Sequence, residues 1–133
     1  MRVIRILIVD DHPLVRAGVR AMLNQADGIV VVGECADGDQ VVAVADNAHP
    51  DVVLMDMPVV GGADATRNLL ASQPGVKVII LTGWASRSTL DEVAAAGVAG
   101  CVIKGGDPAV LLNAIRAVAA GGTVWPGNPS ADP

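Results

Sequence analysis

The chain has 133 residues, enough for one domain that buries about two-thirds of the surface exposed by its unfolded form. Hydrophobic residues make up 52% of it, with neither Phe nor Tyr, so the core must be built from aliphatic side chains, which suits sheets packed against helices. A formal net charge of -5, without a run of Lys or Arg, argues against direct binding of nucleic acid. No apolar run is long enough for a membrane span or a signal peptide, which predicts a soluble, cytoplasmic protein.

The first predicted strand ends in two adjacent acids. Residues 4–9 form a run that is aliphatic except for Arg5, which is typical of a strand inside a parallel sheet, and Asp10 and Asp11 follow it. His12 is expected to lie at the entry of a helix rather than to act as a ligand. Pro13 suits the first helical turn, so a helix is predicted from there to about residue 25.

Four more strand and helix pairs follow in alternation. Strands are predicted at 29–35, 51–56, 76–81 and 98–103, and helices at 39–47, 63–72, 88–96 and 108–120. The helix at 88–96 is expected to begin with a capping box formed by Ser88 and Asp91. This alternation predicts an α/β fold, a doubly wound five-stranded parallel sheet with the flavodoxin-like order 2-1-3-4-5.

The domain is assigned to residues 1–122, and residues 123–133 are interpreted as a linker or tail. Cys35 and Cys101 fall in strands that are far apart in the predicted order, so both are expected to be reduced core thiols.

Polar side chains at the strand ends should meet at one edge of this sheet. Strands one and three are neighbours in the predicted order, which brings Asp10 and Asp11 close to Asp56. Thr82 and Lys104 end the fourth and fifth strands at the same edge. Three carboxylates this close repel one another unless one is protonated or a hard divalent cation binds, and Mg²⁺ fits best. A carboxylate held by a metal can attack phosphorus, while a lysine and a hydroxyl contact the other phosphoryl oxygens.

Four segments together resemble a known family. They are residues 6–16 (ILIVDDHPLVR), 50–56 (PDVVLMD), 65–67 (ATR) and 95–104 (AAGVAGCVIK). At these separations they resemble the receiver domains of two-component response regulators, in particular the NarL/LuxR class, over nearly the whole chain.

This resemblance implies a role for each strand-end residue. Asp56 would accept phosphate from a histidine kinase, Asp10 and Asp11 would hold Mg²⁺ together with Asp56, and Thr82 and Lys104 would read the phosphoryl group. A receiver of this kind is not an enzyme beyond catalysing its own phosphorylation and dephosphorylation. Its phosphorylation regulates a transcription domain or another partner.

Two departures from the family pattern keep a second function open. The loop after Asp56 is two residues short, although Pro58 still offers a backbone carbonyl to the metal. Cys101 stands where an aromatic switch residue is usual, and Trp84, beside the pocket, is either a loop anchor or a contact residue. The alternative is a degenerate receiver that acts as a phosphorylation-independent interaction or ligand-binding module. An aspartate-nucleophile phosphatase fits less well, because its two acids are separated by a spacer residue.

The last predicted helix has few polar residues. Asn113 and Arg116 are its only ones between about residues 110 and 120, so it is apolar on more than the face a sheet can cover. Leu111 and Ile115 are candidates for an interface. In the resembled class this region serves dimerisation or docks a C-terminal helix-turn-helix domain, so a homodimer is expected, with such a domain attached if the chain is a fragment.

Overall fold

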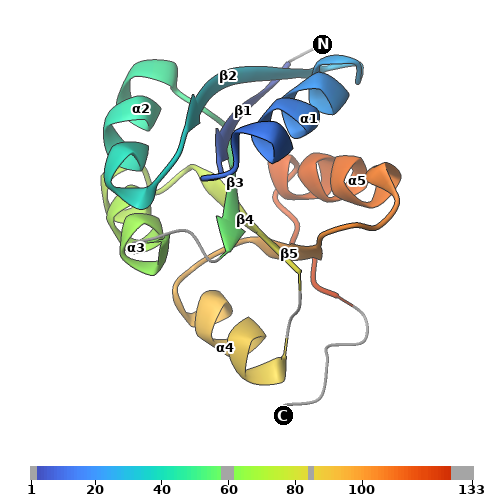
Figure 1. The fold of residues 1–133 in the computed structure, drawn as a ribbon. Helices are drawn as coiled ribbons and strands as arrows, with labels where there is room; N and C mark the ends of the chain where they lie inside the picture. The colour runs from blue at the N-terminus through green and yellow to red at the C-terminus, as the bar shows by residue number, and fades with distance from the viewer. Residues whose placement is uncertain (1–2, 58–61, 84–85, 127–133) are drawn as a thin grey trace.

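The structure is a computed structural model that describes residues 3–57, 62–83 and 86–126. All five strands of its sheet run parallel, in the order β2-β1-β3-β4-β5 (Figure 1). They are β1 (Ile4–Val9), β2 (Ile29–Cys35), β3 (Val52–Met57), β4 (Lys77–Thr82) and β5 (Gly100–Ile103). The predicted fold class and strand order are therefore confirmed.

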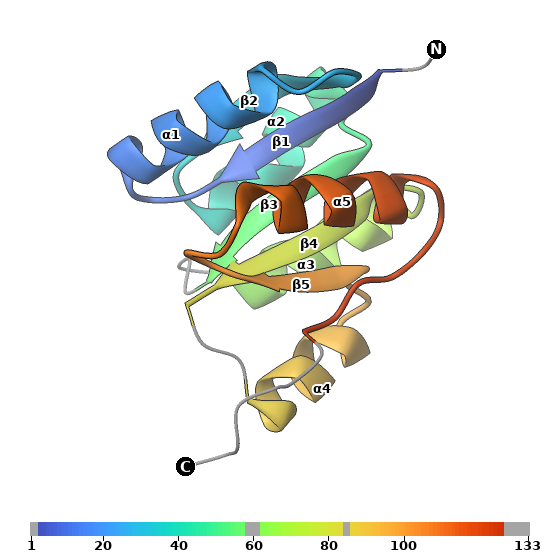
Figure 2. The ribbon, with the colours of Figure 1, turned by 90° about the vertical axis from the view of Figure 1, so that its right-hand side faces the viewer.

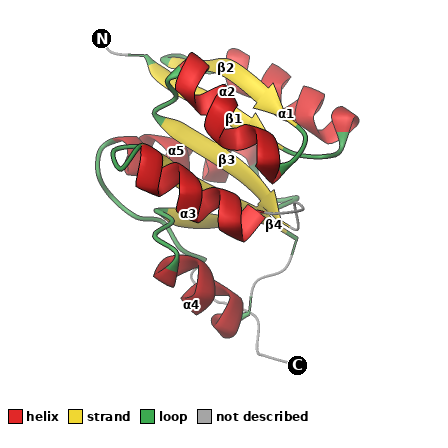
Figure 3. Cartoon of the chain, turned by 90° about the vertical axis from the view of Figure 1, so that its left-hand side faces the viewer, coloured by secondary structure: helices red, strands yellow, loops and turns green. Residues whose placement is uncertain are grey.

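Helices cover both faces of the sheet. Those of the described residues are α1 (Pro13–Asn24), the short 3-10 helix η1 (Gly38–Gln40), α2 (Val41–Ala48), α3 (Gly62–Ser72), α4 (Arg87–Ala95) and α5 (Pro108–Ala119). Figure 2 shows α1 and α5 on one face, and Figure 3 shows α2, α3 and α4 on the other. None of the helices in the described part of the chain has the length and apolar character to cross a membrane.

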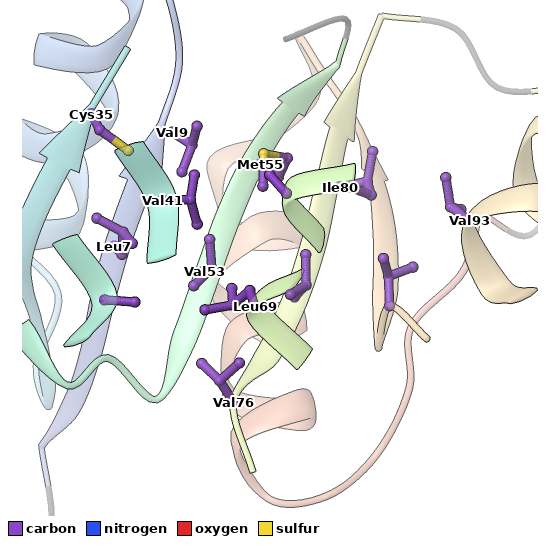
Figure 4. Packing of buried hydrophobic residues seen from close by; sticks show 14 of the residues in the cluster. Leu7, Val9, Cys35, Val41, Val53, Met55, Leu69, Val76, Ile80 and Val93 are labelled. Carbon is purple, nitrogen blue, oxygen red and sulfur yellow. The ribbon is translucent and has the colours of Figure 1, made fainter. Parts of the chain in front are cut away.

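The alternation of side chains along each strand divides the core into two layers. In β1, Ile6 and Ile8 belong to the layer covered by α1 and α5, whereas Leu7 and Val9 belong to the layer covered by α2, α3 and α4. Figure 4 shows the second layer, in which Leu7 and Val9 lie with Val41 and Leu69. Successive side chains of a strand point to opposite faces, so a strand covered on both sides is apolar over most of its length.

The start of α4 differs from the prediction. The N-cap is Ser86, whose hydroxyl accepts a hydrogen bond from the backbone N–H of Thr89 at 3.1 Å. The capping box predicted at Ser88 is therefore wrong by two residues. Both serines have suitable chemistry, and spacing alone did not show which of them has extended backbone geometry.

The prediction for α5 is corrected as well. Leu111 is 8% exposed and Ile115 is fully buried, and both pack in the core layer under α1 and α5. Because they lie inside the chain's own core, they are not available to a partner. On this helix the exposed large hydrophobic side chain is Val110, at 53%.

The folded part of the chain extends beyond residue 122. Val124 bridges to Gly100 at the outer edge of β5, and Trp125 packs against the layer that contains Cys101. The boundary of the predicted linker therefore lies too early, since two residues assigned to it belong to the packed domain.

Candidate functional site

The sheet order brings three acids to the carboxyl ends of two neighbouring strands. Asp10 and Asp11 follow the end of β1, and Asp56 is the penultimate residue of β3, whose Met55 lies beside Val9. Ligand atoms of these acids and of His12 all lie within 4.8 Å of one another. This convergence is the one predicted from the strand order.

Asp10 is the most firmly anchored of the three acids. Its backbone N–H donates to the carbonyl of Cys35 at 3.1 Å, and its Oδ1 accepts from the N–H of His12 at 2.8 Å. Its side chain is 3% exposed, against 45% for that of Asp11. The cluster therefore contains one acid that is held by the fold and another that faces solvent.

Asp56 is a buried carboxylate with one charged partner. Its side chain is 3% exposed, and its Oδ1 forms an ion pair with Lys104 Nζ, whose side chain is 33% exposed. Among the described residues no other group donates a hydrogen bond to this oxygen. Burying a carboxylate is costly unless it is paired, so this lysine supplies the counter-charge for Asp56 inside the sheet.

Thr82 and Lys104 reach the site from β4 and the end of β5. Thr82 is buried and lies in register between Met57 of β3 and Ile103 of β5. Its carbonyl accepts a hydrogen bond from the backbone N–H of Lys104 at 2.7 Å. The structure thus brings both residues to the edge at which the sequence placed them.

Arg16 is a neighbour of the site that the sequence reasoning missed. Its Nη1 donates to the carbonyl of Asp10 at 2.6 Å, and its Nε lies 3.2 Å from Glu34 Oε1. Arg20 holds the other oxygen of Glu34 at 2.7 Å. Side chains lean toward the N-terminus of their helix, so an arginine in the first turn after the acids was the available signal.

His12 joins the cluster although it was expected only at the helix entry. It is the N-cap residue of α1, as predicted, and makes no side-chain capping hydrogen bond. Its Nδ1 lies 2.9 Å from Asp11 Oδ1 and 3.4 Å from Asp10 Oδ1, with the side chain 70% exposed. The imidazole can therefore swing away and leave the oxygen ligands free.

Three predicted site residues remain. Two of them, Pro58 and Trp84, lie outside the described residues. Cys101 lies in β5, is 2% exposed and, like Cys35, is a free thiol. Burial raises the pKa of the Cys101 thiol to about 11, so this side chain is a neutral, small, apolar group at neutral pH.

The donor set suits a hard cation. The three carboxylates supply oxygen ligands at one edge, and the described residues place no thiolate among them. Oxygen ligands of this kind are those that Mg²⁺ and Ca²⁺ prefer.

Comparison with known proteins gives a consistent result. Residues 6–116 match the family model of the response regulator receiver domain. The response regulator GacA of Pseudomonas viridiflava is 45% identical over 120 residues, which cover 89% of this chain and 56% of that protein. The response regulator UvrY of Escherichia coli strain K12 is 44% identical over 120 residues, 89% of this chain and 55% of that protein. The chain thus spans about half the length of the curated relatives it matches.

Solved structures share the fold. A two-component response regulator of the LuxR family from Aurantimonas sp. SI85-9A1 superposes with a TM-score of 0.87 at 35% identity, covering 92% of this chain and 89% of that one. The isolated REC domain of RcsB from Salmonella enterica serovar Typhimurium gives 0.84 at 27% identity, with 95% of each chain covered. The family match covers most of the chain and the fold agrees, so this chain belongs to the response regulator receiver domain family.

Proposed function

We propose that Asp56 is the phosphoacceptor of this receiver and takes its phosphoryl group from a histidine kinase. The observation that carries the proposal is the buried Asp56 carboxylate, which lies beside Asp10 and Asp11 and is paired with Lys104. A carboxylate is a possible nucleophile toward phosphorus, and the lysine provides positive charge where phosphoryl oxygens would gather.

Asp10, Asp11 and Asp56 would hold Mg²⁺ through their carboxylates. The fit rests on ligand atoms within 4.8 Å of one another and on the absence of a thiolate among those of the described residues. When bound, Mg²⁺ offsets the charge of the incoming phosphoryl group. Asp10 supports the site from a fixed position, because its backbone is tied to β2 and its side chain to the start of α1.

The chemistry at Asp56 is an in-line displacement. A carboxylate oxygen attacks phosphorus, the P–N bond to the donor histidine breaks, and the nitrogen leaves with its electron pair. Lys104 Nζ then pairs with a phosphoryl oxygen, and the Thr82 hydroxyl donates to another. Hydrolysis of the acyl phosphate by water restores Asp56, so the only chemistry of the domain is its own modification.

The phosphorylation of this cytoplasmic receiver controls an output that regulates transcription. Support comes from the relatives, since the part of GacA and of UvrY that this chain does not cover is large enough for another domain. In the resembled class that domain is a helix-turn-helix module, which would contact DNA in place of the acidic receiver.

A second copy of the chain is the partner of the α1 and α5 face. Exposed hydrophobic side chains lie on both helices: Leu14, which is 86% exposed, and Val15 on α1, and Val110 on α5. Val15 also lines a groove of about 330 Å³ between α1, β5 and α5. A structure of RcsB, 26% identical, is described as two dimers bound to two parallel DNAs, which supports self-association as a property of such receivers.

Light scattering over a range of concentrations tests this partner. Leu14→Glu and Val110→Glu should lower the average mass, whereas Val3→Glu, at an exposed position outside this face, should not. A wild-type chain that stays monomeric at every concentration would exclude the homodimer.

Intact-mass spectrometry after exposure to acetyl phosphate and Mg²⁺ tests the phosphorylation. The wild-type chain should gain one phosphoryl group, and Asp56→Asn should gain none. A chain that is never modified, under conditions that modify another receiver, would favour the phosphorylation-independent interaction module, for which Cys101 in place of an aromatic residue is the supporting observation.

A further inference from the structure

The chain turns back after α5 and runs along the outer edge of β5. Gly121 has a left-handed backbone with a φ of 99°, and the N–H of Gly122 donates to the carbonyl of Ala117 at 2.9 Å. Figure 2 shows the chain leaving α5 and returning toward β5. We call residues 124–126 the strap.

The strap is attached to β5 as a further parallel strand would be. The N–H of Val124 donates to the carbonyl of Ala99 at 3.2 Å, and the N–H of Cys101 donates to the carbonyl of Val124 at 2.9 Å. These bonds satisfy backbone groups that an edge strand would otherwise leave open.

The side chains of the strap follow the two layers of the core. Val124 packs against the layer under α1 and α5, and Trp125 packs against the layer under α2, α3 and α4. This alternation is that of a strand, and both side chains are half-buried. The strap therefore extends the core on both sides of the sheet.

Gly100 fixes the position of the strap. A Cβ atom at this residue would lie 2.7 Å from the carbonyl oxygen of Val124, closer than real contacts allow. The φ of Gly100 is not in the left-handed region, so close approach of the strap, rather than backbone conformation, is what requires glycine here.

Trp125 lies beside the small side chain of Cys101. Both residues, with Val110 and Val124, line a cavity of about 310 Å³. The aromatic side chain that Cys101 lacks is thus supplied near the same position by the strap. Since Lys104 directly follows β5, the strand that carries the strap also carries the partner of Asp56.

We propose that the strap is a regulatory element, docked on β5 while Lys104 is paired with Asp56 and loosened when Asp56 is modified. This inference rests on the proposed phosphorylation. Lys104 Nζ now contacts Asp56 Oδ1, and a phosphoryl group on Asp56 gives this lysine a new partner, which shifts the residue that follows β5. The strap's hydrogen bonds to Ala99 and Cys101 depend on the position of this short edge strand.

Amide hydrogen exchange of the whole chain, followed by NMR, reads the strap directly. In wild type the Val124 N–H should be protected. After modification by acetyl phosphate and Mg²⁺, the Val124 N–H should exchange at least about fivefold faster, because coupling between linked sites is commonly 5- to 150-fold. The Asp56→Asn variant should show the same increase. Intact mass of the same sample reports the modification. The Asp51 N–H, which donates to the carbonyl of Arg5 at the amino ends of the strands, should keep its exchange rate.

Two glycine variants provide matched controls. Gly100→Ala should remove the protection of Val124 and leave Asp51 protected, whereas Gly75→Ala, where a Cβ meets no atom within 4 Å, should change neither. If Gly100→Ala does not fold, Trp125→Ala takes its place with the same expectation.

The outcomes separate this proposal from the phosphorylation. A Val124 amide that is unprotected in wild type overturns the strap, as does a modified chain in which its exchange is unchanged. If acetyl phosphate adds no mass, the proposed phosphorylation fails and the Asp56→Asn variant tests the strap. Faster exchange of the Val124 N–H in this variant supports the coupling between Asp56 and the strap. Unchanged exchange overturns the strap proposal as well.

Discussion

The charged groups at the two ends of the parallel strands differ in how fully they are paired. At the amino ends, Asp51 Oδ2 accepts from the N–H of Arg5 at 2.9 Å, and the Arg5 guanidinium donates to the carbonyls of Ala48 and His49 at 2.6 and 3.1 Å. At the carboxyl ends, the carboxylates of Asp10, Asp11 and Asp56 lie close together, and Lys104 is paired with Asp56.

This contrast separates a stabilising arrangement from a binding one. Each group at the amino ends has a partner, and the Arg5 side chain satisfies carbonyls at the C-terminal end of α2 that the helix itself leaves open. At the carboxyl ends negative charge is in excess, which costs stability in the free chain and is relieved when a cation binds. Charge changes at the two ends should therefore alter stability with opposite signs.

The largest expected effect is at the amino ends. Asp51→Ala should lower the free energy of unfolding by about 1.5 kcal/mol, because a hydrogen bond to a charged acceptor contributes about 1.5 to 3 kcal/mol and this one is exposed. Urea denaturation measures the loss. Asp64→Ala, which removes an exposed ion pair with Arg67 and an acid in the first turn of α3, is the control and should cost less than about 1 kcal/mol.

The opposite sign is expected at the carboxyl ends. Asp10→Asn, without metal, should raise the free energy of unfolding by about 1 kcal/mol, because two like charges 4 Å apart repel by about that much even in water. The amide oxygen can still accept the hydrogen bond from the N–H of His12. The same urea denaturation, with a chelator present, measures the gain. A lower free energy of unfolding would show that the acids at the carboxyl ends are as fully paired as Asp51.

Much of the fold could be predicted because apolar strands and helical repeats each have their own periodicity. Residues 29–35 were placed as a strand with the bounds that β2 has in the structure, and the strand order followed from the alternation of elements. The placement of Asp10 and Asp56 at one edge followed in turn, since the carboxyl ends of parallel strands share an edge.

What could not be predicted depends on contacts rather than on periodicity. Leu111 and Ile115 were predicted to face a partner because hydrophobicity alone does not show how much of a helix its own sheet covers. Arg16 was missed because its partner is a backbone carbonyl, and its place in the first turn of α1 was the only sign of this contact in the sequence. The docking of Val124 was hidden by Gly and Pro residues that are typical of a linker.

The most direct test of the contrast between the two ends is a Mg²⁺ titration of thermal unfolding. The free energy of unfolding of the wild-type chain should rise with Mg²⁺, by about 0.4 kcal/mol at a concentration equal to the Kd and further with its logarithm. Asp11→Asn should respond at higher concentration, and Asp51→Ala should respond as wild type does, each compared with NaCl of equal ionic strength. A wild-type chain that Mg²⁺ does not stabilise, or an Asp11→Asn chain that it stabilises equally, would contradict the account.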